Sequence, residues 1–200
     1  MDEHSDVSKI LAAVEIGQLG IADPVGFPRV VPVNFVWHKG AVWFHGASEG
    51  EKYTLLQTAP KVTFMAYLPH SSIPSYWRSP NYACPASIFY KSVYIKGRGE
   101  TVGDISIASE ALQSLMEKYQ PDGGFAKITP GEAIYARAFK ETALFRIIPE
   151  TVEVKSKFGQ NLSPDARRNL IEKLKQRGTL LDIATVAEME KTLLPPPPKP

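Results

Sequence analysis

The stretch from Arg29 to Tyr67 constrains the fold more than any other part of the chain. Its first run, Val30 to Trp37, is rich in β-branched and aromatic residues that favour strands, and a Gly-containing hairpin turn follows it. A second strand, Ala41 to Phe44, leads through a loop of small residues into a predicted helix, Lys52 to Ala59. A proline ends that helix, and the alternation beyond it predicts another strand. The order predicts an antiparallel sheet with one helical connection.

The loop between the second strand and the helix, HGASEGEK at residues 45–52, has the composition of an anion-binding site. Small residues let backbone N–H groups approach a phosphate, and Lys52 adds a full positive charge at the start of a helix. The loop is not a P-loop, since the pattern Gly-x-x-x-x-Gly-Lys-Ser/Thr is absent. On spacing alone, a phosphate site and a solvated helix with an ordinary surface lysine fit equally well.

Strand and helix patterns recur on both sides of this stretch. Further strands are predicted at Gly17 to Ala22, Ala86 to Val102 and Thr142 to Ile148, the last continued after Pro149 by Val152 to Val154, and further helices at Ser5 to Val14, Ser106 to Tyr119, Glu132 to Phe139, Pro164 to Arg177 and Leu181 to Leu193. Ser106 and Ser163 are the expected N-caps of their helices. The pattern predicts a mainly β, α+β domain.

Composition excludes several classes of protein. A net charge of +2 without a basic block predicts no nucleic-acid binding. No apolar run approaches the roughly 18 residues of a membrane span, and the acidic N-terminus is not a signal peptide, so we expect a cytoplasmic protein without membrane contact. The lone cysteine, Cys84, excludes an internal disulfide and is expected to be a buried apolar residue. The four histidines lack ligand spacing, so no metal site is expected.

Between Pro69 and Pro85 lie four prolines, which predict an irregular segment instead of a sheet ladder. Its aromatic residues and Arg78 are compatible with two interpretations. The segment lies beside a ligand and shapes a substrate pocket, or its aromatic residues pin it to the surface.

Four ordered motifs resemble one family. They are VVPVNFVW, VWFHGASEGEKYTLLQTAPKVTF, FYKSVYIKGRGETV and KFGQNLSPDARRNLIEKL. Together they resemble the FMN-binding split-barrel superfamily of pyridoxamine 5′-phosphate oxidase, and within it the branch of nitroimidazole-reductase-like flavin-binding proteins. The resemblance implies a six-stranded antiparallel split barrel with flanking helices, and a homodimer with one FMN at each edge of the subunit interface. We expect the barrel domain at 1–154, a C-terminal helical extension packing on the barrel or the dimer partner at 155–194, and a disordered Pro-rich tail at 195–200.

The resemblance also places the cofactor. The FMN phosphate is expected on Lys52 and the loop N–H groups, helped by Arg29, and the isoalloxazine along the backbone of residues 31–34. Ser92 matches a position that presents a polar side chain to the flavin, although pyridoxamine 5′-phosphate oxidases carry glutamine there. The implied cofactor-binding residues are Arg29, Val31, Pro32, Val33, Asn34, His45, Gly46, Ala47, Ser48, Gly50, Lys52 and Ser92.

His45 is the candidate catalytic residue, because the matching histidine in nitroimidazole-reductase-like proteins lies close to the flavin or substrate. It can hydrogen-bond the flavin or donate a proton to a reduced substrate near neutral pH. The alternative is a histidine satisfied by a backbone partner at the barrel rim. The implied substrate pocket takes Trp77, Arg78, Lys157, Gln160 and Asn161.

The resemblance implies an oxidoreductase that passes electrons from NAD(P)H to a small organic acceptor, such as a nitroaromatic compound or a quinone. Glu51 stands where the oxidases often carry arginine, which predicts weaker flavin binding. An Arg-x-His pattern near the C-terminus is missing, which argues against pyridoxamine 5′-phosphate oxidation. The alternatives are a non-catalytic protein that binds or senses flavin, haem or deazaflavin, and a Pai-type FMN-binding regulator, for which the KFGQN segment is the only indication.

Overall fold

The computed structural model describes residues 3–58 and 60–193. Two predictions therefore fall outside the described residues. They are the last residue, Ala59, of the helix predicted at Lys52 to Ala59, and the disordered tail predicted at 195–200. The chain divides into two compact units. The first unit comprises Met1–Ala66 and Val93–Val154, and the second comprises Tyr67–Ser92 and Lys155–Pro200. The division passes through three long strands, each of which gives residues to both units.

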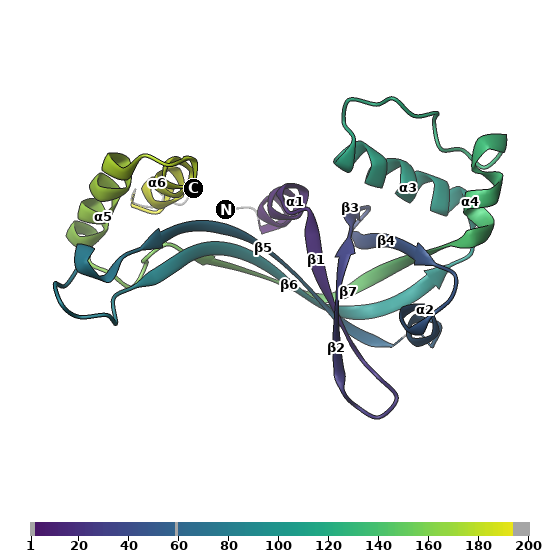
Figure 1. The fold of residues 1–200 in the computed structure, drawn as a ribbon, viewed down its shortest axis with the longest axis horizontal. Helices are drawn as coiled ribbons and strands as arrows, with labels where there is room; N and C mark the ends of the chain where they lie inside the picture. The colour runs from purple at the N-terminus through teal and green to yellow at the C-terminus, as the bar shows by residue number, and fades with distance from the viewer. Residues whose placement is uncertain (1–2, 59, 194–200) are drawn as a thin grey trace, which may run out of the picture. The chain divides into compact units, whose positions relative to one another are not determined.

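Seven strands form one curled antiparallel sheet in the order β2-β1-β5-β6-β7-β4-β3 (Figure 1). The strands are β1 (Ile16–Ala22), β2 (Pro28–Asn34), β3 (Val36–His38), β4 (Ala41–Ala47), β5 (Lys61–Ile73), β6 (Ser87–Val102) and β7 (Thr142–Lys157). The helices are α1 (Glu3–Ala13), α2 (Glu51–Leu56), α3 (Ile105–Tyr119), α4 (Ala136–Glu141), α5 (Pro164–Arg177) and α6 (Leu180–Lys191), with 3-10 turns η1 (Ser75–Trp77) and η2 (Ala133–Tyr135). The predicted α+β split-barrel class is confirmed, with seven strands in place of six.

The seventh strand arises because the predicted strand Val30 to Trp37 changes partners at Phe35. Before it, β2 pairs with β1; after it, β3 pairs with β4. The backbone N–H of Phe35 donates to the Tyr119 hydroxyl at 2.9 Å instead of joining a ladder. Its ring is fully buried and meets Phe64 edge to face at 4.8 Å. A buried anchor at this point therefore splits one predicted strand into two.

The segment from Pro69 to Pro85 was predicted to be irregular, but its first residues belong to a strand. β5 continues through Pro69 to Ile73. The ladder between β1 and β5 reaches only to the pair Gln18–Met65, so the proline lies past its end. A proline is tolerated where the strand has no neighbour that needs its missing N–H. The remainder, from Pro74 to Ala86, contains only the turn η1.

In the first unit, α3 covers β3 and β4 (Figure 1). Ala108, Ala111 and Leu115 bury their side chains against Val36, Trp43 and Leu144. The helix begins one residue earlier than predicted, because Asp104 is the N-cap: its carboxylate accepts from the N–H groups of Ser106 and Ile107. The predicted cap at Ser106 was therefore wrong.

Lys118 of α3 ties three parts of the first unit together. Its ammonium donates to the carbonyls of Leu11, Val14 and Phe35 at 2.7 to 2.9 Å and lies 3.7 Å from the centre of the Phe35 ring. Burial lowers the pKa of Lys118 to about 8. The cation is thus held directly by carbonyl dipoles and an aromatic face, and the Glu15 carboxylate acts on it only through its charge.

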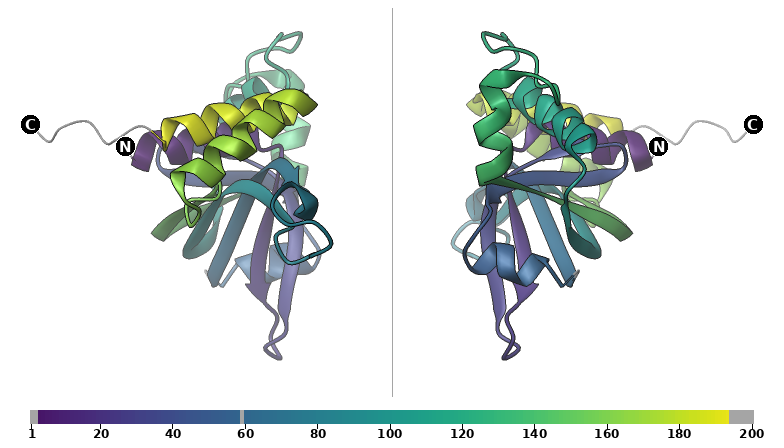
Figure 2. Two further views of the ribbon diagram at one scale, coloured as in Figure 1. Left: turned by 90° about the vertical axis from the view of Figure 1, so that its left-hand side faces the viewer. Right: turned by 90° about the vertical axis from the view of Figure 1, so that its right-hand side faces the viewer.

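The second unit has a core of its own. Figure 2 shows α5 and α6 side by side, and their apolar faces pack together with strand residues. The buried members are Ile73, Phe89, Phe158, Leu170, Ile171, Leu174, Val186 and Met189. Ser163 caps α5 by accepting from the N–H of Ala166 at 3.3 Å, and Gly178 ends it with a positive φ of 67°, as the sequence predicted for the cap. In residues 3–58 and 60–193, no helix combines the length and apolarity that a membrane span requires.

Candidate functional site

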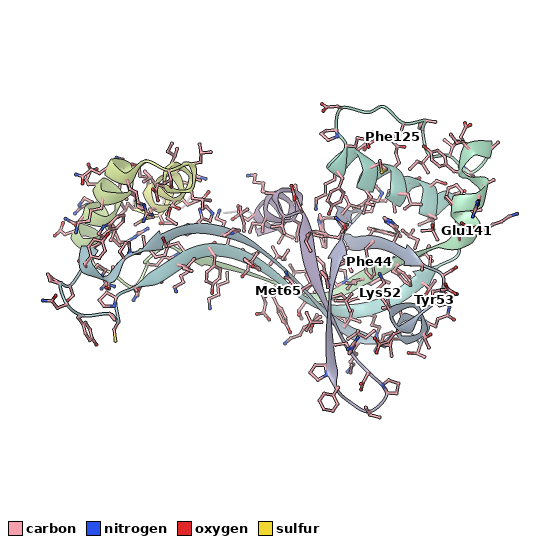
Figure 3. All side chains as sticks on the ribbon, in the orientation of Figure 1. Phe44, Lys52, Tyr53, Met65, Phe125 and Glu141 are labelled. Atoms are coloured by element: carbon pink, nitrogen blue, oxygen red, sulfur yellow. The ribbon has the colours of Figure 1, made fainter. Side chains whose placement is uncertain are left out.

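Lys52 lies in the first turn of α2 and its side chain points back over β4 (Figure 3). A Cβ placed on Gly46 would lie 2.7 Å from the Lys52 Nζ, so only glycine leaves room for the ammonium in this position. Below it, the stacked rings of Phe44 and Phe145 have their centres 5.8 Å from Nζ. The local sequence, an aromatic strand with glycine as its last residue but one and a short helix after it, therefore creates a position for one cation.

The charge on Lys52 has no counter-ion in the part of the chain that the structure describes. No hydrogen bond or ion pair to its ammonium is found there within the usual distances. Lys52 is half-buried, and this burial lowers the pKa of its ammonium from the ordinary value. A shielded cation without a partner is a suitable position for a ligand anion.

Arg29 lies beside the same loop but is paired. Its guanidinium donates to the Glu51 carboxylate at 2.7 Å, and both side chains are about half exposed. This pair joins the start of β2 to the start of α2. Glu51, which sequence comparison marked as unfavourable for flavin binding, therefore competes for the cation that was expected to assist Lys52.

The loop is anchored at its other end by β7. Gly46 and Ala47 pair with Ala143 and Thr142. The N–H and the hydroxyl of Ser48 both point to the carbonyl of Glu141, at 3.4 and 3.2 Å. The Ser48 hydroxyl thus already donates a hydrogen bond within the protein. Gly50, with φ of 89°, precedes α2 without a side-chain cap, as a glycine conformation allows.

The residues expected along the isoalloxazine lie on β2, at the edge of the sheet. Val33 is buried in the core, Pro32 and Asn34 are exposed, and Val31 is half-buried. Pro32 pairs with Gln18, and an edge strand is where a proline is tolerated. Gln18 Oε1 is buried without a hydrogen-bond partner in the described residues. The expected ring-binding backbone therefore has one open side.

His45 has solvent on one side and an apolar pocket of about 200 Å³ on the other. The pocket walls come from α3 and from the segment leading into β7. They include Leu112, Leu115, Met116, Ile128, Tyr135 and Phe139. Burial and the positive charge of Lys52 lower the pKa of His45, which favours the neutral imidazole. Sequence reasoning missed these walls, although the helical spacing of the leucines marked an apolar face on residues 106–119.

The expected substrate residues all belong to the second unit, and the structure brings three of them together. Arg78, Lys157 and Asn161 line one pocket of about 270 Å³. Cys84 lies in its wall and is exposed, so the expectation that it is buried was wrong. The positions implied for substrate thus converge only in part.

The other two expected substrate residues have structural roles. The Trp77 ring lies 4.7 Å from the Arg177 guanidinium, and its carbonyl accepts from Lys173. The Gln160 amide accepts from the N–H of Phe158 at 2.8 Å and donates to the carbonyl of Ser156 at 2.9 Å, which closes a turn. Ser92 is half-buried on β6, within the second unit. Among the described residues, no group of three or more His, Cys, Asp or Glu side chains is arranged to hold a metal ion.

With the curled sheet and the loop in place, the chain fits the split-barrel class of proteins. A family model described as pyridoxamine 5′-phosphate oxidase matches residues 3–156. The chain belongs to this family, and the predicted membership of the split-barrel superfamily is confirmed. No curated protein matches the chain.

Solved structures share the fold at low sequence identity. A putative 5-nitroimidazole antibiotic resistance protein from Bacteroides thetaiotaomicron is 20% identical with a TM-score of 0.62, covering 77% of this chain and 84% of that one. A FAD and haem binding protein from Mycobacterium smegmatis is 13% identical with a TM-score of 0.64, covering 83% and 77%. The flavocytochrome Anf3 from Azotobacter vinelandii is 20% identical with a TM-score of 0.60, covering 76% and 66%. These similarities establish the fold.

Proposed function

We propose that this protein binds FMN at the loop 45–52 and passes electrons from NAD(P)H to a small organic acceptor, such as a nitroaromatic compound or a quinone. The observation that carries the proposal is the Lys52 ammonium, shielded by aromatic rings, seated over Gly46 and without a carboxylate partner in the described residues. Family membership and the names of fold relatives, a FAD and haem binding protein and a flavocytochrome, support a flavin ligand.

The residues of the loop suit a phosphate site better than a solvated helix with an ordinary surface lysine. Lys52 supplies a charge. Beyond Ser48, whose N–H donates to the Glu141 carbonyl, Glu49 and Gly50 are exposed and lie outside the ladder with β7. Arg29 can join them only by leaving Glu51, at little cost because an exposed ion pair is weak. The edge strand β2 would hold the ring system.

When bound, a flavin supplies hydride acceptance and electron transfer; the protein supplies position and charge. Lys52 holds the anionic end, and the neutral imidazole of His45 offers one N–H donor and one acceptor nitrogen. Its lowered pKa favours contact with cofactor or acceptor over proton donation at neutral pH. The apolar pocket beside it is suited to excluding water from a small aromatic acceptor.

We further propose a homodimer formed through the open face of the first unit's sheet. Ile16 of β1, Val30 of β2 and Met65 of β5 are 51%, 68% and 39% exposed on that face. Apolar side chains exposed together mark an interaction surface. Light scattering on the purified protein tests this: we expect twice the chain mass, and a monomer for Val30→Asp. A wild-type monomer would contradict the proposal.

The test of function begins with titration of FMN, FAD, haem and deazaflavin into the purified protein, followed by absorbance. We expect FMN to bind and Lys52→Ala to weaken it by about tenfold to a hundredfold, the value of one charge-assisted contact. Lys127→Ala is the matched control, an exposed lysine of the same unit. An unchanged FMN affinity of Lys52→Ala would show that Lys52 does not bind the phosphate.

Reduction of the bound flavin distinguishes an oxidoreductase from a protein that only binds or senses flavin. The FMN complex is mixed anaerobically with NADH or NADPH, and its bleaching is followed, then its reoxidation by a nitroaromatic compound and a quinone. Bleaching and acceptor-dependent recovery support the oxidoreductase. A flavin that binds but is never bleached would favour the non-catalytic binding or sensing protein. Preferential haem binding would favour a haem carrier.

A further inference from the structure

The pocket of the second unit is formed by two segments that are far apart in the sequence. The stretch after β5 supplies Arg78 and Cys84 and leads to Ser87 at the start of β6. Lys157 ends β7, and Asn161 lies in the turn that follows it. Its volume is about 270 Å³. This lies just below the usual range of roughly 300–1,000 Å³ for drug-sized ligands, so the pocket suits a small molecule and is too small for a nucleotide.

The cations of this pocket differ from most others in the second unit. Neither Arg78 nor Lys157 has a carboxylate partner among the described residues, and no Asp or Glu lines the pocket. Several other cations of the unit are paired, as Lys91 is with Glu188 at 2.6 Å and Arg177 with Asp182 at 2.5 Å. Two uncompensated cations in one concave site attract an anion.

The floor of the pocket is apolar and belongs to the core of the unit. Ile73, Phe89 and Leu170 are buried there, and Leu162 is partly buried. Gly159 has a φ of 71°, and a Cβ on it would approach Leu162 at 3.2 Å and Phe89 at 3.3 Å. The turn that carries Lys157 and Asn161 is closed by both hydrogen bonds of Gln160. The site is therefore pre-organised, which reduces the entropy lost on binding.

We propose that this pocket binds a small organic anion. Its carboxylate or phosphate group contacts Arg78, Lys157 and the Asn161 amide, and its short apolar body lies on Phe89 and Leu162. Arg and Asn side chains donate directionally to oxyanions, and the apolar floor selects against fully hydrated inorganic ions. The proposal does not depend on flavin binding, because none of these residues belongs to the loop 45–52.

Cys84 provides the test, since it is the single cysteine of the chain and lies exposed in the pocket wall. Its alkylation rate is measured at low ionic strength with iodoacetate and with iodoacetamide, reagents of equal size that differ in charge. In both reactions the thiolate sulfur forms a bond to the CH₂ carbon and iodide leaves. The ratio of the two rates is compared with the ratio for N-acetylcysteine.

We expect the anionic reagent to be favoured by about fivefold to tenfold over the free thiol, because the local cations concentrate it. Arg78→Ala combined with Lys157→Ala should bring the ratio of the two rates to that of N-acetylcysteine. Lys175→Ala, which removes an exposed charge of the same unit away from the pocket, should preserve the preference. A wild-type ratio equal to that of N-acetylcysteine would overturn the proposal.

Protection experiments then define the ligand. Benzoate, phenyl phosphate and their neutral analogue benzamide are each added before iodoacetamide. Slower alkylation with benzoate supports a carboxylate ligand, slower alkylation with phenyl phosphate alone supports a phosphate ester, and either supports the proposal when Arg78→Ala removes the protection. Equal protection by benzamide, or protection by none of the three, would overturn it.

Discussion

Lys52 of the first unit and Arg177 of the second are both cations held near aromatic rings, and they differ in their partners. Arg177 lies 4.7 Å from the Trp77 ring and donates to both oxygens of Asp182, at 2.5 and 2.9 Å, and to the carbonyl of Ser72. Lys52 lies 5.8 Å from two rings, without a carboxylate in the described residues. Arg177 is therefore paired within the fold, whereas Lys52 remains available to a ligand.

The pKa shifts express the same difference. Arg177 and the hydroxyl and N–H donors around it hold the pKa of the Asp182 carboxyl well below its usual range, so this buried carboxylate stays charged. Burial alone lowers the pKa of Lys52. A buried, satisfied charge pair stabilises a unique packing, whereas a shielded single charge costs stability unless a ligand compensates it. The comparison therefore separates a cation that is paired within the fold from one that is available to a ligand.

The largest expected effect comes from breaking the satisfied pair. Asp182→Asn leaves Arg177 uncompensated, and an NH₂ donor replaces one of the two oxygens that accept from Ser71 and Thr179. We expect a loss of about 3 kcal/mol in the free energy of unfolding, the usual cost of removing one partner of a buried pair. Urea denaturation measures it. Asp165→Asn, which disrupts the exposed pair with Arg168, should cost under about 1 kcal/mol. Equal costs for the two variants would show that burial does not distinguish the pairs.

Lys118→Met tests a cation satisfied by carbonyls. The variant keeps most of the apolar stem but removes three hydrogen bonds, leaving the carbonyls of Leu11, Val14 and Phe35 without that donor. We expect a loss of about 2 kcal/mol, because such bonds are individually modest and not additive. Thermal unfolding followed by circular dichroism measures it. A loss below 0.5 kcal/mol, the range of ordinary surface substitutions, would mean that water replaces the ammonium easily.

Glu51→Gln should sharpen the comparison by freeing a second cation at the loop. The change removes the carboxylate that holds Arg29 at 2.7 Å. If the loop binds the FMN phosphate, we expect FMN affinity to rise by about twofold to fivefold, the scale of one exposed charge interaction. Quenching of FMN fluorescence measures the affinity, and Glu49→Gln on the same exposed loop is the control. Equal gains in both variants would indicate a general charge effect and not release of Arg29.

Local signals made much of this fold predictable. The helix at 164–177 begins at a Ser-Pro pair and ends at a glycine, and the loop at 45–52 follows an aromatic strand, all within short range. What escaped prediction depends on partners distant in sequence. Arg29 meets Glu51 across 22 positions, and Phe35 meets Tyr119 across 84. The sequence predicted that Trp77 and Gln160 line a substrate pocket. Their contacts in the folded chain instead give both residues structural roles.

The smallest expected effect concerns His70, a buried side chain of the second unit whose Nδ1 lies 3.3 Å from the Thr185 hydroxyl and whose Nε2 has no partner in the described residues. Burial lowers its pKa; Glu188 opposes the shift and Lys91 adds to it. The unfolded chain therefore binds a proton more readily than the folded one below about pH 6.5. Stability should be fully present above that pH and should fall as the pH drops through this window.

We expect the urea midpoint of the wild type to decrease between pH 7.5 and pH 5.5 by more than that of His70→Asn, which keeps an acceptor near Thr185 without titrating. The difference follows the direction of the shift, because protonation of the buried imidazole is opposed in the folded protein and not in the unfolded chain. Subtracting the variant removes the contributions of the other titratable groups. If the two midpoints change in parallel, the buried imidazole does not titrate with unfolding. The polar groups of the second unit would then act as a fixed scaffold over the whole pH range.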